Sequence, residues 1–216
     1  MGILHGVNAS PFVRKVRVAL KEKGIDYELD PVFPMNQSEE FLKISPLGKI
    51  PVYTPQEGVN IPDSSVIIAY LEKTHPDQPL YPSDATAFAR ALWFEEYGDS
   101  ALVSACGTVF FQRLVGPRFM GQTTDEAAVR KALEEDLPPI LAYMDGEIGA
   151  KEFIAGDGFT IGDIGLCSPL VNLMHAGESV DSAKYPNLAR YAAGIHSRSS
   201  FAELIDEEKA TFSQAA

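Results

Sequence analysis

Cysteine is scarce in this chain, because only Cys106 and Cys167 occur among its 216 residues. The two lie far apart and form no CxxC pair, so a redox protein of the thioredoxin type is poorly supported. We expect two reduced and mostly buried thiols, which suits a reducing compartment. The four histidines show no spacing typical of metal ligands, so no metal site is predicted.

Long apolar runs and positive charge are also lacking. No apolar run approaches the ~20 residues that span a membrane, and Met1 leads into a strand-like segment without a signal-peptide pattern. The 18 basic residues face 30 acidic ones, which gives a net charge of −12. Such a surface repels phosphate backbones, although a few local cations still attract a small anion at short range. We expect a cytoplasmic protein that binds neither nucleic acid nor membrane.

The remaining composition is that of an ordinary globular protein. Apolar residues make up 45% of the chain and charged residues 22%, which argues against disordered and fibrous classes. The length fits one compact unit of two domains.

The first part of the chain alternates between strand-like and helix-like patterns. Short apolar runs predict strands at residues 2–7, 27–33, 51–54 and 59–61. Apolar residues at helical spacing predict three helices. The first starts near residue 12 and stops at Gly24, the second covers residues 38–44 with Ser38 as its N-cap, and the third covers residues 66–73 behind Asp63 or Ser64. This βαβ and then ββα order predicts a compact α/β domain.

A proline-rich segment then separates two compositions. Residues 75–82 contain three prolines in eight residues, which is typical of an extended linker. Beyond it the apolar period is helical throughout. The predicted helices cover residues 85–115 (one helix, or two with a break), 125–149 with a kink at Pro138 and Pro139, 164–175, 187–196 and 201–212. We therefore expect domains at residues 1–76 and 87–216, joined by a linker at residues 77–86.

Three motifs occur in order along the chain. They are SPFVRKV at residues 10–16, SPLGKIPV at residues 45–52 followed by IPDSSVI at residues 61–67, and TIGDI at residues 160–164. Over nearly the whole chain this set resembles the cytosolic glutathione transferases, and its Ser-Pro-Phe start is closest to their serine-type classes. The resemblance implies a thioredoxin-like α/β domain with a four-stranded mixed sheet, followed by an all-α domain that shapes the electrophile site.

Ser10 has two interpretations. As the N-cap of the following helix, its hydroxyl accepts a backbone N–H and contributes about 1 kcal/mol. The resemblance implies that the hydroxyl instead donates to the thiolate of glutathione. Lowering the pKa of a thiol by about two units requires ~2.7 kcal/mol, which one charged hydrogen bond and a helix dipole can supply. No tyrosine precedes Tyr27, so a tyrosine that activates the thiol near the first strand is absent. No cysteine occupies this turn either, so the resemblance implies conjugation or addition rather than disulfide exchange.

Two further motifs imply contacts with glutathione. Pro51 opens a strand and is compatible with a simple edge position. The resemblance implies a cis peptide bond before it, which leaves the backbone of Ile50 to pair with the cysteinyl residue of glutathione. Lys49 is then a cation for the glycyl carboxylate, or only an exposed loop lysine. Gln37 matches a position that supplies another contact at the glycyl end.

Asp63 and Ser64 are ordinary capping residues before an apolar helix. In the resembling family an acidic residue followed by serine holds the γ-glutamyl end of the peptide, although most members carry glutamate where this chain has Asp63. Thr160 and Asp163 fit a capping box, and both the residue pattern and the resemblance give them a structural role.

The stretch after residue 109 is rich in aromatic side chains, for which core packing is the default. The resemblance implies that some of them line an apolar electrophile pocket together with residues of the first domain. The expected lining residues are Phe12, Phe33, Met35, Phe110, Phe111, Leu114, Arg118 and Phe119. Arg118 and its neighbour Arg113 either pair with an anionic substrate or decorate a surface.

The resemblance thus predicts a glutathione transferase with a role in detoxification and no tightly bound cofactor. Its expected partners are glutathione as co-substrate, a small apolar electrophile and a second copy of the chain in a homodimer. The segment around Trp93, Phe94 and Glu95 would face the other copy. Two alternatives remain. An activated thiolate also serves isomerase and peroxidase reactions, and the same fold can serve as a non-catalytic carrier or interaction module.

Overall fold

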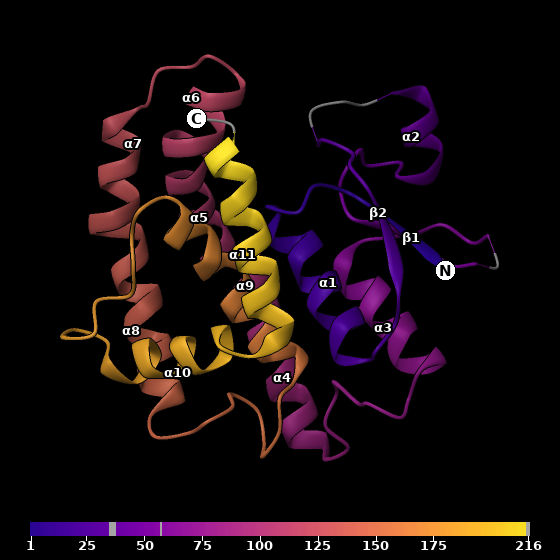
Figure 1. Cartoon of the computed structure of the whole chain (residues 1–216). Helices are drawn as coiled ribbons and strands as arrows, with labels where there is room; N and C mark the ends of the chain where they lie inside the picture. The colour runs from indigo at the N-terminus through magenta and orange to yellow at the C-terminus, as the bar shows by residue number, and fades with distance from the viewer. Residues whose placement is uncertain (35–37, 57, 215–216) are drawn as a thin grey trace. The chain divides into compact units, whose positions relative to one another are not determined.

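The computed structural model describes residues 1–34, 38–56 and 58–214. The chain divides into two compact units, Met1–Leu80 and Tyr81–Ala216 (Figure 1). Among the described residues, no helix has both the length and the apolar character that a membrane crossing requires.

Unit 1 contains a four-stranded mixed sheet in the order β2-β1-β3-β4. β1 (Gly2–His5) pairs parallel with β2 (Tyr27–Asp30) and antiparallel with β3 (Val52–Thr54), which in turn pairs antiparallel with β4 (Ile61–Pro62). The register places Leu4 opposite both Leu29 and Tyr53. The predicted α/β domain with a mixed sheet is confirmed.

The prediction of the fourth strand at residues 59–61 was wrong by about two residues. The chain turns at Gly58, whose φ is 81°, and Val59 is exposed. The side chain of Asn60 accepts a hydrogen bond from the Thr54 hydroxyl at 2.8 Å. Asn60 therefore ties the turn to β3, and regular pairing resumes only at Ile61.

The described part of unit 1 also contains three helices, and each begins after a residue whose side chain caps it. α1 (Pro11–Glu22) begins after Ser10, α2 (Glu39–Ile44) after Ser38 and α3 (Ser64–Thr74) after Asp63. The predicted Ser38 cap is confirmed, since its hydroxyl accepts the backbone N–H of Phe41 at 3.2 Å. α1 and α3 pack side by side. Their fully buried apolar residues are Val13, Val16, Val18, Ala19, Leu20, Ile67, Ile68 and Leu71.

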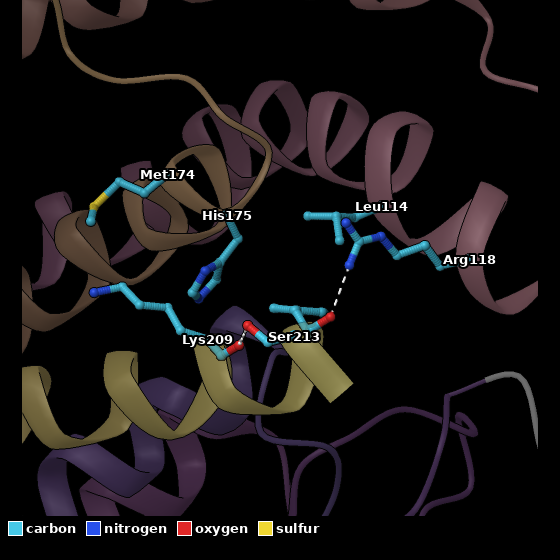
Figure 2. Close-up of a pocket in the computed structure, with 7 residues that line it drawn as sticks. Leu114, Arg118, Met174, His175, Lys209 and Ser213 are labelled. Carbon is cyan, nitrogen blue, oxygen red and sulfur yellow. Dashed lines mark hydrogen bonds between the residues drawn. The ribbon is translucent and has the colours of Figure 1, made fainter. Parts of the chain in front are cut away.

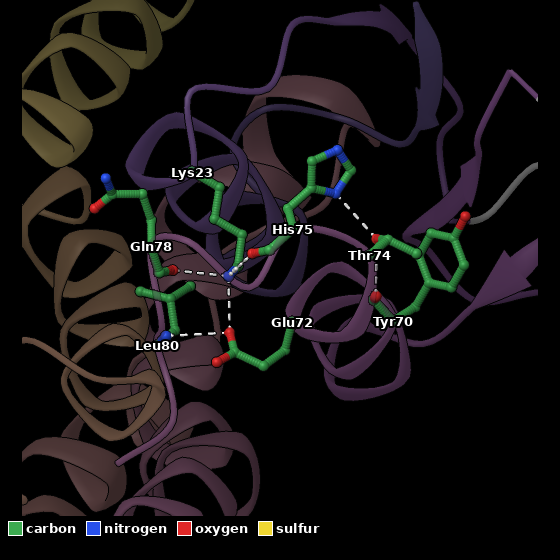
Figure 3. A network of polar contacts seen from close by, with 7 residues as sticks. All are labelled: Lys23, Tyr70, Glu72, Thr74, His75, Gln78 and Leu80. Atoms are coloured by element: carbon green, nitrogen blue, oxygen red, sulfur yellow. Dashed lines mark hydrogen bonds and ion pairs between the residues drawn. The ribbon is translucent and has the colours of Figure 1, made fainter. Parts of the chain in front are cut away.

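A buried lysine fixes the segment that ends unit 1. The ammonium group of Lys23 lies 2.7 Å from a carboxylate oxygen of Glu72 and donates to the backbone carbonyls of His75 and Gln78 at 2.9 and 2.8 Å (Figure 3). The same carboxylate oxygen accepts the backbone N–H of Leu80 at 3.1 Å. The proline-rich segment is therefore held by polar contacts rather than by regular secondary structure.

All regular secondary structure in the described part of unit 2 is helical. Its first continuous stretch comprises α4 (Ala85–Tyr97), η1 (Gly98–Leu102), α5 (Val103–Phe110), η2 (Phe111–Val115) and α6 (Gly116–Phe119), and its second comprises α7 (Glu126–Lys131), η3 (Ala132–Asp136) and α8 (Leu137–Ile148). The η segments are single π-helical turns. The expected helix at residues 85–115 is thus one stretch that continues to Phe119. The disturbance expected at Pro138 falls in η3, just before it, since proline is tolerated in the first turn of α8.

α9 (Ile161–His175) lies inside the helical unit and packs against α4, α5 and α10 (Pro186–His196). A Cβ atom at Gly98 would lie 2.3 Å from the backbone oxygen of Gly165, so this close approach requires glycine. α11 (Ser199–Gln214) follows α10.

The predicted capping box is present at the start of α9. The backbone N–H of Thr160 donates to the Asp163 carboxylate at 2.7 Å, which also accepts from the backbone of Ile154 at 2.8 Å and from the Tyr191 hydroxyl at 2.6 Å. Because Thr160 is itself the cap, the helix begins at Ile161 and not at residue 164 as expected. Asp163 is fully buried, so its carboxylate links the start of α9 to Ile154 and Tyr191 inside the core of unit 2.

Candidate functional site

In unit 1, packing and hydrogen bonds bring the three motif segments of this unit together. A Cβ atom at Gly6, just after β1, would contact both Val13 of α1 and the side chain of Ile50. The backbone N–H of Asp63 donates to the carbonyl of Pro51 at 3.2 Å. The start of α1, the turn before β3 and the start of α3 therefore meet at one end of the sheet.

Ser10 stands at the N-terminus of α1 with extended backbone angles and is partly exposed. Its hydroxyl accepts the backbone N–H of Val13 at 3.4 Å, which is long for a capping hydrogen bond. No acidic residue lies in the first turn of α1. Because a helix N-terminus carries a partial positive charge, this end of α1 favours an anion next to the Ser10 hydroxyl.

The peptide bond between Ile50 and Pro51 is cis, as the resemblance implies. Ser45, to which the sequence assigned no role, fixes the turn before it. The Ser45 hydroxyl accepts the backbone N–H of Lys49 at 3.1 Å and donates to the Lys49 carbonyl at 2.6 Å. The side chain of Lys49 remains exposed.

Asp63 is the only described residue other than glycine with a positive φ, at 78°. Its carboxylate accepts the backbone N–H groups of Ser65 and Val66 at 2.9 and 3.2 Å and so caps α3. Backbone strain of this kind is common at ligand clamps. Asp63 itself is exposed, whereas Ser64 is 2% exposed. The predicted Gln37 lies outside the described residues.

Lys15 is a charged residue at this site that the sequence reasoning missed. It is 1% exposed, and its ammonium group donates to the Ser65 hydroxyl at 3.0 Å, so α1 reaches the first turn of α3. The sequence held one signal for the burial of Lys15. It lies between the apolar residues Val13 and Val16 on a helix whose following residues, up to Leu20, are also buried.

The predicted electrophile residues are only partly brought together. Leu114 and Arg118 line a pocket of about 550 Å³ within unit 2, where Phe110 lies behind the lining and packs edge-on against Phe212 at 5.9 Å. Phe111 is half-buried and Phe119 is exposed, and neither lines this pocket. The other lining residues are Met174, His175, Lys209, Phe212 and Ser213 (Figure 2).

The remaining predicted pocket residues belong to unit 1. Phe12 is half-buried at the start of α1, and Phe33 is 52% exposed after β2. Met35 lies outside the described residues. Phe94 and Glu95 belong to the segment expected to face another chain. Both are buried, with Phe94 stacked on Tyr143, whereas Trp93 in the same segment is 50% exposed.

The fold and its site define a class of protein: a thioredoxin-like unit with a cis-proline turn beside a helix N-terminus, followed by an all-helical unit. Family models for the glutathione S-transferase N-terminal domain and C-terminal domain match residues 4–79 and 127–194. A glutathione S-transferase of Hyoscyamus muticus is 27% identical over 94% of this chain and 97% of its own length.

Solved structures agree with this match. A glutathione S-transferase from Rhodospirillum rubrum has a TM-score of 0.85 at 29% identity, covering 94% of this chain and 91% of that one. One from Methylobacterium radiotolerans, in complex with glutathione sulfonate, has a TM-score of 0.76 at 32% identity, covering 94% of both chains. The chain belongs to the glutathione S-transferase family and is a glutathione transferase.

Proposed function

We propose that this enzyme conjugates the thiolate of glutathione to small apolar electrophiles, and that the Ser10 hydroxyl stabilises the thiolate. The observation that carries the proposal is the start of α1, where a partly exposed hydroxyl with one long capping contact stands at the N-terminus of a helix that has no acidic residue in its first turn. The hydroxyl proton can turn toward a bound sulfur while the oxygen still faces the Val13 N–H.

The energetic requirement is modest. A free thiol with a pKa near 8.5 is mostly protonated at neutral pH, and lowering that pKa by about two units takes ~2.7 kcal/mol. A charged hydrogen bond contributes ~1.5–3 kcal/mol and a helix N-terminus ~0.3–1 kcal/mol. The thiolate then supplies the electron pair for the new sulfur–carbon bond, and the leaving group departs with its own electron pair. In an addition, the carbanion that results takes a proton from solvent.

The same unit supplies candidates to hold the peptide. The backbone of Ile50 would pair with the cysteinyl residue, Lys49 and Gln37 would face the glycyl carboxylate, and Asp63 with Ser64 would hold the γ-glutamyl end. The meeting of these segments at one end of the sheet supports this assignment. Glutathione is a co-substrate in this scheme. The reaction needs no tightly bound cofactor, and we propose that the enzyme acts as a cytoplasmic homodimer.

The test is an ultraviolet difference titration of the protein with glutathione, read in the thiolate band across pH. Ser10→Ala is the test variant and Ser38→Ala is the matched control, because Ser38 also caps a helix of unit 1 through its hydroxyl. We expect the wild type and Ser38→Ala to bind glutathione as thiolate well below the pKa of the free thiol, and Ser10→Ala to lose that shift.

Two other outcomes would contradict the proposal. If glutathione binds to the wild type as an unshifted thiol, the site only holds the peptide and Ser10 is only a cap. If Ser10→Ala keeps the shift, another group stabilises the thiolate.

A further inference from the structure

The chain contains two Asp-Gly pairs, and both lie in unit 2. Asp145-Gly146 lies inside α8, whereas Asp157-Gly158 lies in the irregular segment between α8 and α9. In such a pair the backbone nitrogen of glycine can attack the side-chain carboxyl of aspartate, because glycine has no Cβ atom to obstruct the approach. The two pairs carry the same reactive groups, so their surroundings decide whether they react.

The Asp157-Gly158 pair is open to this attack. Both residues are exposed, and the preceding Gly156 has a positive φ of 85°. A Cβ atom added at Gly158 would meet nothing within 4 Å. Within the described part of the chain, neither the Asp157 carboxylate nor the Gly158 N–H takes part in a hydrogen bond. The two reacting groups are therefore accessible to each other and to water, as is typical of a loop tip.

The Asp145-Gly146 pair is held away from the same reaction. The Asp145 carboxylate accepts the backbone N–H of Leu188 at 2.9 Å and the side-chain amide of Asn187 at 3.1 Å. Gly146 lies inside α8, where its N–H belongs to the hydrogen bonds of the helix. Attack there requires local opening of α8, so this pair is a control within the same molecule.

The segment that carries Asp157 is held at both ends by one buried carboxylate. Asp163 accepts the backbone N–H of Ile154 at 2.8 Å and that of Thr160 at 2.7 Å. These two hydrogen bonds fix the span of the residues between them. An additional backbone atom within this span would therefore disturb the capping box at the start of α9.

From these observations we infer that Asp157 is a site of spontaneous isomerisation, where the enzyme acquires an isoaspartate as it ages. The Gly158 nitrogen attacks the protonated side-chain carboxyl of Asp157 and forms a C–N bond, which closes a cyclic imide. The hydroxyl of the carboxyl group leaves with the amide proton as water.

The imide is then hydrolysed by solvent. Water adds to one of its two carbonyl carbons, the C–N bond at that carbon breaks, and a proton returns to the nitrogen. Breakage at the side-chain carbonyl restores Asp157. Breakage at the main-chain carbonyl gives isoaspartate, whose main chain runs through Cβ and Cγ and is longer by one methylene group. No oxidant or co-reactant other than water takes part.

The experiment follows the intact wild-type protein over several weeks at physiological temperature and neutral pH, once native and once unfolded in guanidinium chloride. Trypsin then separates the two pairs, because cleavage after Lys131, Lys151 and Lys184 places them on peptides 132–151 and 152–184. Mass spectrometry with electron-transfer fragmentation distinguishes isoaspartate from aspartate in each peptide. Methylation of the protein by an isoaspartate carboxyl methyltransferase measures the total.

We expect isoaspartate to form at least about tenfold faster at Asp157 than at Asp145 in the native protein, because Asp145 reacts only when α8 opens. In guanidinium chloride the two rates should lie within about a factor of three, since the structure that separates them is lost. Gly158→Ala should slow the reaction severalfold, because its Cβ crowds the attacking nitrogen. Gly146→Ala is the matched control and should leave Asp157 unaffected, because Gly146 is also exposed and has the same free space around it.

Thermal unfolding of the aged protein gives a second readout. The aged wild type should show an additional transition below the Tm of the fresh protein. Aged Asp157→Glu should not, because glutamate would have to close a larger ring. An unchanged unfolding curve in a sample that contains isoaspartate at Asp157 would refute the disturbance of the capping box.

Two results would overturn the assignment of the site. They are equal rates at Asp157 and Asp145 in the native protein, and reaction of Asp157 only in guanidinium chloride. Neither readout uses glutathione, so the outcome is separate from that of the thiolate titration.

Discussion

Asp63 combines a structural and a proposed ligand-binding role that two substitutions can separate. Its carboxylate caps α3 through hydrogen bonds of 2.9 and 3.2 Å to two backbone N–H groups. Asparagine is an equally good N-cap and tolerates positive φ, so Asp63→Asn keeps the cap and removes only the charge. Asp63→Ala removes the cap and leaves an alanine at a φ of 78°.

The expected magnitudes differ clearly between the two variants. Loss of the cap costs ~0.5–2 kcal/mol and alanine at positive φ adds ~1 kcal/mol, so Asp63→Ala should be destabilised by about 1.5–3 kcal/mol. For a chain of this length that lowers Tm by roughly 3–12 °C. Asp63→Asn loses only the interaction of its charge with the helix dipole, ~0.3–1 kcal/mol.

Calorimetric titration with glutathione provides the second readout. If the carboxylate holds the amino group of the γ-glutamyl end, Asp63→Asn should bind glutathione about 10- to 100-fold more weakly, because a charged hydrogen bond contributes ~1.5–3 kcal/mol. Unchanged glutathione affinity in Asp63→Asn would show that the side chain only caps α3. Equal loss of stability in both variants would refute the capping argument instead.

Two further predictions concern groups outside the proposed chemistry. Lys23→Met leaves the partly buried Glu72 carboxylate without its ion pair, so the free energy of unfolding measured in urea should fall by about 3 kcal/mol. A loss below about 1 kcal/mol would show that the contacts of Lys23 contribute almost nothing to the net stability. Burial raises the pKa of Cys106 to about 12 and also raises the pKa of Cys167, so neither thiol should react with an aromatic disulfide in the native protein at neutral or mildly alkaline pH. Both should react in denaturant, and fast labelling of the native protein would contradict the burial argument.

The fold could be predicted from the sequence wherever local chemistry determines it. The Ser38 cap and the capping box of Thr160 and Asp163 are present in the structure because a cap needs only a hydroxyl or carboxylate at a fixed offset from a helix start. The interruptions of the long helical stretches could not be predicted. They are π-helical turns, one of which begins at Gly98. At this position the backbone approaches α9 so closely that any side chain would clash, so the need for glycine arises from tertiary packing and not from local sequence.

The site shows the same limit. Leu114 and Arg118 were expected to line a pocket because of the resemblance, but Lys209 and Met174 belong to segments that the helical period treats as separate. Lys15 was missed for another reason. A lysine on a helix is normally solvated, and its burial against Ser65 depends on how α1 packs on α3.

The strongest discrimination available from the sequence concerns which serine cap faces a ligand. Ser10 and Ser38 both accept a backbone N–H three residues on, at 3.4 and 3.2 Å, so capping geometry alone does not distinguish them. The first turns do. α2 carries Glu39 and Glu40 there, whose charges already compensate its N-terminal dipole, whereas α1 has no acidic residue in its first turn. A bound thiolate would be repelled at α2 and stabilised at α1, and for this reason Ser38→Ala is the control that makes the Ser10→Ala titration decisive.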